Sequence, residues 1–162
     1  MDESAAVRLP GKLRSFIDDL DLFSDRAERI EALIGVAERY RPVPERIAIR
    51  PFPERNKVPA CESQAYEWAE ELPDGTLKFH FAVENPQGIS AKALAAILDE
   101  TLSGQPLAEV AQVPGDVIYR IFGNELSMGK SMGLMGMVAM VREHAQQQLA
   151  RQGGAAMTRL SS

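Results

Sequence analysis

Residues 63–83 read SQAYEWAEELPDGTLKFHFAV. In 77–83, large apolar side chains alternate with Lys, His and Ala, which is the period of a half-buried strand. Residues 63–69 alternate in the same way, and Pro73-Asp74-Gly75 between the two segments is typical of a turn. The stretch therefore predicts an antiparallel β-hairpin, and the fold class follows from what surrounds it.

Helical patterns precede and follow this hairpin. In the second helix we expect Ser24 as the N-cap, with Asp25 in the first turn. Its predicted inward face consists of Ile30, Leu33, Ile34, Ala37 and Tyr40. Helices are predicted over 12–20, 25–40, 90–102, 106–110, 116–122 and 129–148. This order predicts an α+β fold, a small antiparallel sheet packed against several helices.

Length and composition indicate one domain over residues 1–162. We expect an ordered core of about 12–150, with a mobile leader before it and a mobile tail after it. The composition, 45% hydrophobic and 25% charged, is that of a globular protein, and the net charge of −5 argues against a nucleic-acid partner. Since no apolar run reaches about 18 residues, no membrane span is expected. One cysteine and no export signal indicate a cytoplasmic protein.

Cys61 is the only cysteine, so it has no partner within the chain for a disulfide. A free cysteine is most often a small buried apolar residue, and that interpretation stays open. The neighbouring residues favour a thiol presented on a turn, because Pro59 interrupts the chain just before it. Arg55 and Lys57 would favour a thiolate, and Ser63 could donate a hydrogen bond to it.

Other side chains give weaker signals. Residues 128–140 hold five of the seven methionines, and thioethers can bind Cu(I), but a gap-filling helix face is the stronger interpretation. The Gly-x-x-x-Gly spacing in the same segment is typical of close packing against a helix. His80 and His144 are more readily surface histidines than bases. We find no catalytic triad, metal-ligand cluster or phosphate-binding glycine loop, and expect no cofactor.

Three separated motifs resemble those of the SufE family of sulfur-acceptor proteins. Residues 56–66, NKVPACESQAY, resemble the family stretch Asn-Lys/Arg-Val-x-Gly-Cys-x-Ser-x-Val-Trp. Residues 126–137, LSMGKSMGLMGM, resemble Leu-Ser-x-x-Arg-x-x-Gly-Leu-x-x-Met at the start of the last helix. The third match is the helical segment 91–98 with the turn 104–106 after it. The resemblance covers about 12–150.

The chain also departs from the family pattern. Ala60 replaces a glycine, so the backbone before the thiol takes a positive φ less easily. Ala65-Tyr66 replaces Val-Trp, although Trp68 could fill similar space. Lys130 replaces an arginine, which keeps the charge but loses the planar fork. These departures affect the identity of the partner and the efficiency of the protein's activity more than they affect the fold.

The resemblance implies a persulfide relay. Cys61 would accept sulfur from a pyridoxal-phosphate-dependent cysteine desulfurase, stimulate that enzyme and pass the sulfur to an iron–sulfur scaffold. Lys130, expected opposite the thiol, would bind the persulfide or the desulfurase; that it is simply an exposed lysine at a helix end stays open. Lys57 and Ser63 would support the thiolate and its loop. The protein would have no turnover alone. A homodimer stays open.

In the family, the loop that carries the cysteine shields its sulfur in an apolar pocket. Here Val58, Tyr66 and methionines of the last helix are the expected walls. The alternative function is a non-catalytic adaptor that docks on a desulfurase or another enzyme, with Cys61 as a structural residue. Exposure of the thiol to an alkylating reagent discriminates the two.

Overall fold

The computed structural model describes residues 9–161, and the side chains of 9–154. The predicted leader therefore lies mostly outside the described residues. The elements are α1 (Gly11–Leu20), α2 (Arg26–Ala37), the 3₁₀ helix η2 (Glu54–Asn56), β1 (Ala65–Glu71), β2 (Leu77–Val83), α3 (Ile89–Leu102), α4 (Leu107–Val110), α5 (Val117–Phe122) and α6 (Met128–Ser161). The predicted α+β class is confirmed.

β1 and β2 form the predicted antiparallel hairpin. The register runs from Ala65 opposite Val83 to Glu71 opposite Leu77. At the turn, Leu72 N donates to Thr76 O over 2.8 Å, and Gly75 takes the left-handed conformation with a φ of 88°. Glycine adopts that region without steric cost, which is why Pro73-Asp74-Gly75 ends the first strand.

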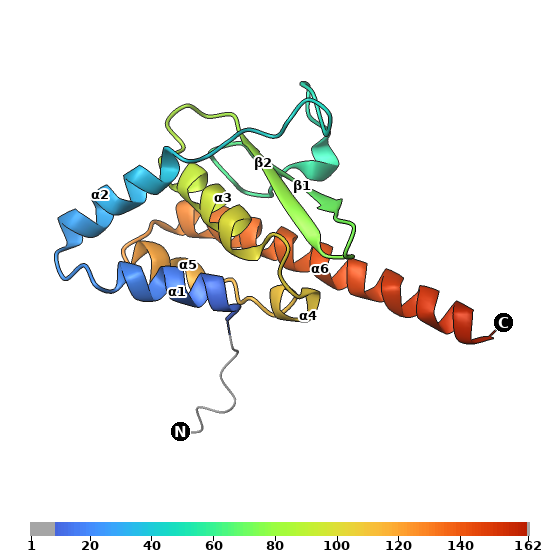
Figure 1. Cartoon of the computed structure of the whole chain (residues 1–162). Helices are drawn as coiled ribbons and strands as arrows, with labels where there is room; N and C mark the ends of the chain where they lie inside the picture. Colours follow the sequence, from blue (N-terminus) through green and yellow to red (C-terminus); the bar gives the residue numbers. More distant parts are fainter. Residues whose placement is uncertain (1–8, 162) are drawn as a thin grey trace.

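The hairpin covers one side of a helical layer (Figure 1). β2 packs on α3 and β1 on α6, while α1, α4 and α5 lie on the other side of these two helices. The shared core is formed by the inward side chains of the sheet and by the apolar sides of α3 and α6. Its largest fully buried members include Phe79, Leu94, Ile97, Leu98 and Met137.

Both edges of the two-stranded sheet are occupied. On β2, Val43 N donates to Phe81 O over 2.8 Å, and Val83 N donates to Tyr40 Oη over 2.9 Å. On β1, Val58 N donates to Ala65 O over 2.8 Å. An isolated hairpin is only marginally stable, and open edges invite pairing with other chains. The connectors therefore complete the sheet.

The inward face predicted for α2 is confirmed at Leu33, Ala37 and Tyr40, which pack in or against the core, but it is wrong at Ile30 and Ile34, and the predicted cap is wrong too. Asp25, not Ser24, is the N-cap, because its carboxylate accepts a 3.0 Å hydrogen bond from Ala27 N. Leu33 is buried, whereas Ile30 and Ile34 are 47% and 42% exposed. The helix is rotated relative to the prediction, and the side chain that faces inward one turn before Leu33 is Arg29.

Arg29 explains that rotation. Its guanidinium donates to Leu20 O over 3.2 Å, to Ile121 O over 3.3 Å and also to Arg120 O. These carbonyls belong to the ends of α1 and α5, which lack partners within their own helices. A charged side chain thus holds three helices together at a position that an apolar pattern assigns to solvent.

α6 is longer than predicted, reaching Ser161 instead of ending near Gln148. Gln148 is buried, and its Nε2 donates to Gly75 O over 3.2 Å; Gln152 Nε2 donates to the same oxygen over 3.0 Å. These two bonds fasten the extended helix to the hairpin turn. No helix in the part of the chain described here is long and apolar enough to cross a membrane.

Candidate functional site

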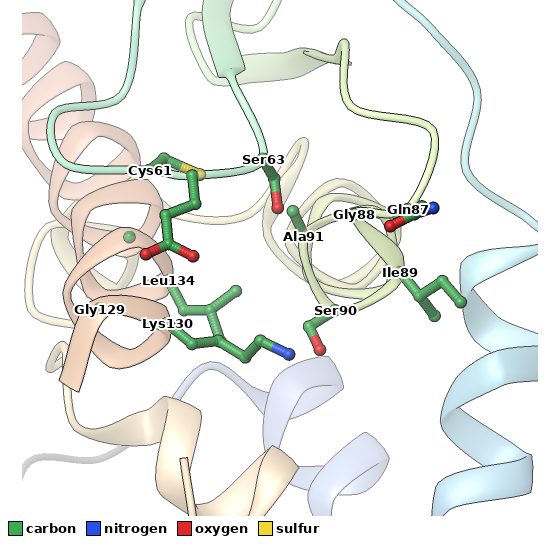
Figure 2. A pocket seen from close by; sticks show the side chains of 12 residues that line it. Cys61, Ser63, Gln87, Gly88, Ile89, Ser90, Ala91, Gly129, Lys130 and Leu134 are labelled. Carbon is green, nitrogen blue, oxygen red and sulfur yellow. The ribbon is translucent and has the colours of Figure 1, made fainter. Parts of the chain in front are cut away.

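Cys61 lies four residues before β1, at the end of the hairpin opposite the turn, as the sequence predicts. It is half-buried and lines a pocket of about 210 Å³. Three segments enclose that pocket: the cysteine loop, residues 87–91 at the start of α3, and residues 129–134 at the start of α6 (Figure 2). Segments far apart in sequence thus meet at the only thiol.

Main-chain hydrogen bonds tie down both ends of the cysteine loop. Before the thiol, Val58 N donates to Ala65 O over 2.8 Å. After it, Asn85 N donates to Ser63 O, and Glu84 N to Gln64 O, each over 3.1 Å. Ser63 does hold the loop, as expected, but through its main-chain carbonyl. Its hydroxyl side lines the pocket.

Two residues without a glycine's freedom take the left-handed conformation in this loop. Ala60 has a φ of 57° and Gln64 a φ of 52°. The backbone before the thiol therefore adopts the positive φ that an alanine takes less easily than a glycine does. The loop keeps the shape that a glycine would give it, and the alanine bears the steric cost.

Lys130 lines the same pocket as Cys61, in agreement with the expectation that it lies opposite the cysteine loop. Its side chain extends from the first turn of α6 toward Ser90 at the start of α3 (Figure 2). Ser127 Oγ accepts a 3.2 Å hydrogen bond from Lys130 N, which fixes the start of the helix. Among residues 9–154, Lys130 forms no ion pair with a carboxylate, so its charge is available to a ligand.

Lys57 lies on the other side of the thiol. Its main chain bridges to Tyr66, and its side chain lines a separate, more open depression together with Pro59, Ala60 and Cys61. The structure thus puts a cation on each side of Cys61, one in the pocket and one outside it. We therefore expect Lys130 to act on a ligand inside the pocket, and Lys57 to act only on groups outside it.

The walls of the pocket differ from the expectation. Tyr66 points to the outer face of the hairpin, where its ring centroid lies 5.2 Å from that of Phe52 and 6.2 Å from that of Trp68. Val58 is fully buried beneath the loop, outside the pocket. The apolar wall is formed by Ile89, Ala91 and Leu134.

The methionines of α6 whose side chains are described also lie outside this wall. Met128 is 80% exposed, whereas Met137 is fully buried in the core, so their thioethers do not gather at one place. Within the described part of the chain, no group of three or more His, Cys, Asp or Glu residues is arranged to hold a metal ion. The glycines at 129, 133 and 136, in contrast, all face the cysteine loop. The close contact predicted from their spacing is made with this loop.

A buried pair on the inner face of β1 was missed by the sequence reading. Glu67 is fully buried, and His144 Nε2 of α6 lies 2.9 Å from its Oε2. The ring is poorly aligned for donation, so neither Glu67 oxygen receives a well-formed hydrogen bond from the described residues. Burial raises the pKa of Glu67, and the contact with Glu67 raises the pKa of His144. The sequence did contain a signal for this burial: Glu67 alternates along the strand in phase with Ala65 and Ala69, so it belongs to the same face as these two apolar residues.

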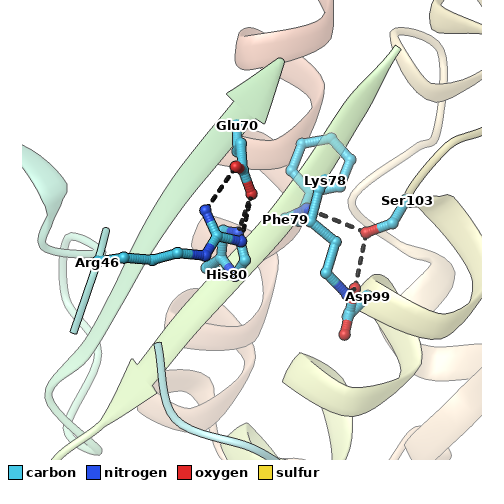
Figure 3. A network of polar contacts seen from close by, with 7 residues as sticks. All are labelled: Arg46, Glu70, Lys78, Phe79, His80, Asp99 and Ser103. Atoms are coloured by element: carbon cyan, nitrogen blue, oxygen red, sulfur yellow. Dashed lines mark hydrogen bonds and ion pairs between the residues drawn. The ribbon is translucent and has the colours of Figure 1, made fainter. Parts of the chain in front are cut away.

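His80, expected at the surface, is instead buried, in a different cluster on the outer face of the hairpin (Figure 3). Its Nε2 lies 2.9 Å from Glu70 Oε1, and Arg46 donates to both oxygens of the same carboxylate over 2.6 and 3.0 Å. Arg46 and His80 together lower the pKa of Glu70 to about 2. Neither this histidine nor His144 lines the thiol pocket.

An apolar groove adjoins the thiol pocket. Ile30, Ile34, Phe122 and Leu126 line it, and it shares Ile89 and Ser90 with the pocket. The two exposed isoleucines of α2 are thus part of a continuous surface that leads to Cys61.

Comparisons with known proteins bear on this site. Residues 14–145 match the family model SufE, described as an Fe-S metabolism associated domain. No curated protein matches the chain. Among solved structures, the solution structure of a hypothetical protein from Thermus thermophilus is similar, with a TM-score of 0.65 and 19% identity. The similarity covers 88% of this chain and 99% of that one, and at this identity it shows the fold.

Proposed function

This chain belongs to the SufE family and has a role in iron–sulfur metabolism, and we propose that within this role Cys61 accepts, carries and hands on sulfur. The donor would be a cysteine desulfurase, a pyridoxal-phosphate enzyme that holds a persulfide on its own cysteine. The final acceptor would be the scaffold on which clusters are assembled. The protein would stimulate the desulfurase by removing its sulfur, with no turnover alone.

The proposed step is a thiol–persulfide exchange. The Cys61 thiolate attacks the outer sulfur of the donor's persulfide, and a new S–S bond forms as the donor's S–S bond breaks. The donor's inner sulfur leaves as a thiolate and takes up a proton from water. One sulfur atom changes carrier, so no external oxidant or reductant is required.

The observation that carries the proposal is the environment of Cys61. The thiol lines a pocket of about 210 Å³, which leaves room for a second sulfur atom. A persulfide terminus is anionic, and Lys130 brings a positive charge to the same pocket. Because the chain has no other cysteine, a sulfur held on Cys61 cannot be discharged as an internal disulfide.

The test is to incubate the protein with a cysteine desulfurase and cysteine and to examine the intact mass and the peptide that contains Cys61. We expect an adduct of one sulfur atom on Cys61, reversed by a thiol reductant, and a desulfurase turnover that rises with the concentration of the protein. Cys61→Ser should abolish both. Equal stimulation by Cys61→Ser and the wild type would refute the relay and support the adaptor.

Lys130 offers a sharper test of the pocket. Lys130→Gln keeps most of the side chain but removes the charge, and we expect slower loading of Cys61. Lys12→Gln, at an exposed position of α1, is the matched control and should load as the wild type does. If Lys130→Gln loads at the control rate, the charge of Lys130 has no part in the transfer.

A further inference from the structure

On the side of α6 that faces Cys61, the glycines at 129, 133 and 136 each lie against a different residue of the cysteine loop. Residues 58–62 of that loop are called the thiol loop below. A Cβ added at Gly129 would lie 2.9 Å from Glu62 Oε1, and one at Gly136 would lie 3.0 Å from Val58 Cγ1 and 3.3 Å from the Pro59 carbonyl oxygen. At Gly129 the nearest atom is the end of the exposed, flexible Glu62 side chain, which can rotate away. At Gly136 the nearest atoms belong to the fully buried, β-branched Val58 and to the main chain of Pro59, so that contact is harder to relieve.

Gly133 differs, because its neighbour is the cysteine itself. A Cβ at Gly133 would lie 3.0 Å from Cys61 Cα, 3.3 Å from its Cβ and 3.3 Å from its Sγ. The Cα belongs to the main chain, so no side-chain rotation can move it away. Gly133 is buried and lines the same pocket as the thiol.

The anchors of the thiol loop decide where the strain of an added methyl group would go. Val58 is held by its bond to Ala65 O, and Ser63 by its bond from Asn85 N. Helix α6 is a regular helix beneath the loop and cannot yield without losing its own hydrogen bonds. The displacement is therefore concentrated in residues 59–62, and the thiol moves with them.

We propose that Gly133 is a positioning residue for Cys61. The missing side chain lets the thiol lie directly against α6, so that the helix covers one side of the sulfur and leaves the other side to the pocket. That this arrangement protects a bound persulfide from water and reductants rests on the proposed carrier function. That Gly133 sets the position of Cys61 does not depend on it.

The test measures the rate at which iodoacetamide alkylates unloaded Cys61 at neutral pH, relative to the rate in the unfolded protein. We expect Gly133→Ala to raise the rate by about threefold or more, because thiol reactivity follows exposure. Gly153→Ala, on the same helix, is the matched control, since an added Cβ at Gly153 meets no atom within 4 Å. Gly129→Ala tests specificity and should stay near the wild-type rate, because its added Cβ meets only the exposed Glu62 side chain, which can rotate away.

Two results would overturn the assignment: an unchanged rate in Gly133→Ala, or the same acceleration in Gly129→Ala. Alanine is the better helix former, so a loss of thermal stability is not expected from the helix itself. Should Gly133→Ala fail to fold, a nuclear Overhauser contact between Gly133 Hα and Cys61 Hβ in the wild type supports the seating, and its absence refutes it.

The protein loaded with a persulfide tests independently whether this arrangement protects the bound sulfur. With a persulfide on Cys61, Gly133→Ala should lose the sulfur to added thiol faster than the wild type does. Equal rates of loss would refute the protective role. If the wild type takes up no sulfur at all, the carrier function fails, while the alkylation and the Overhauser measurement still decide the position of Cys61.

Discussion

Ala60 is the residue at which the strain of the thiol loop can be measured. It takes a φ of 57°, in a region where the Cβ of an L-residue lies too close to the following carbonyl oxygen. That conformation costs about 1–2 kcal/mol for a residue other than glycine. The alanine is exposed, so its methyl group returns little of this cost through packing.

Ala60→Gly should therefore stabilise the protein. Glycine removes the steric cost but gives the unfolded chain more freedom, which takes back about 0.4–1 kcal/mol. The difference between these two ranges leaves a gain of about 0.8 kcal/mol at its centre, within limits of about 0 and about 1.6 kcal/mol, in the free energy of unfolding. For a domain of this size, such a gain corresponds to a rise of about 2 °C in Tm.

The assay is thermal unfolding followed by circular dichroism, with urea unfolding as the isothermal check. Ala27→Gly is the control, since Ala27 is exposed in the regular helix α2 and its replacement should cost up to about 1 kcal/mol. If Ala60→Gly raises Tm while Ala27→Gly lowers it, the backbone conformation at position 60 is the cause of the gain. If Ala60→Gly lowers Tm as Ala27→Gly does, the strain assigned to position 60 is absent and the reasoning fails.

Three further predictions concern the hairpin. Tyr40→Phe removes the acceptor of the Val83 N–H and should cost about 1–2 kcal/mol in urea unfolding, because a buried donor is left unpaired. The pKa values of Glu67 and His144 are both raised in the folded protein. The stability that each group contributes is complete below its ordinary pKa and is lost as pH rises through the folded-state value, so the urea midpoint should fall as pH rises above the ordinary pKa of each group. Glu67→Gln should flatten that decline, and an unchanged slope would refute the coupling. The carboxyl carbon of Glu70 should titrate with a pKa of about 2 by NMR, and a normal glutamate value would show that its ion pairs do not form in solution.

The hairpin and most helices could be predicted because a single period governs each of them. The alternation in 77–83 and the helical spacing in 90–102 hold over whole elements, and the structure confirms both. The orientation of α2 could not be predicted in this way. Its rotation depends on Arg29 and on carbonyls from α1 and α5, which come together only in the folded chain.

At the site, the position of Cys61 followed from its distance to the first strand, and the nearness of Lys130 followed from the family motifs. The apolar wall of the pocket did not follow, because two of its three residues, Ile89 and Ala91, come from the start of α3, which no local pattern links to the thiol. The burial of Glu67 was missed for a related reason. A charged residue is assigned to solvent unless its partner, here His144 on α6, is known beforehand.

The two departures from the family pattern at this site, Ala60 and Lys130, have unequal consequences. An arginine fork exceeds a lysine where two acceptor oxygens must be bound together, as in a carboxylate or a phosphate. The ligand proposed here presents a single anionic sulfur atom, for which the point charge of an ammonium is sufficient. Lysine at position 130 is therefore compatible with the proposed chemistry at little loss, whereas alanine at position 60 has a backbone cost that no ligand returns. The strain lies next to Cys61 in sequence but outside the pocket proposed to receive the sulfur, so we expect it to affect the stability of the fold more than the transfer step.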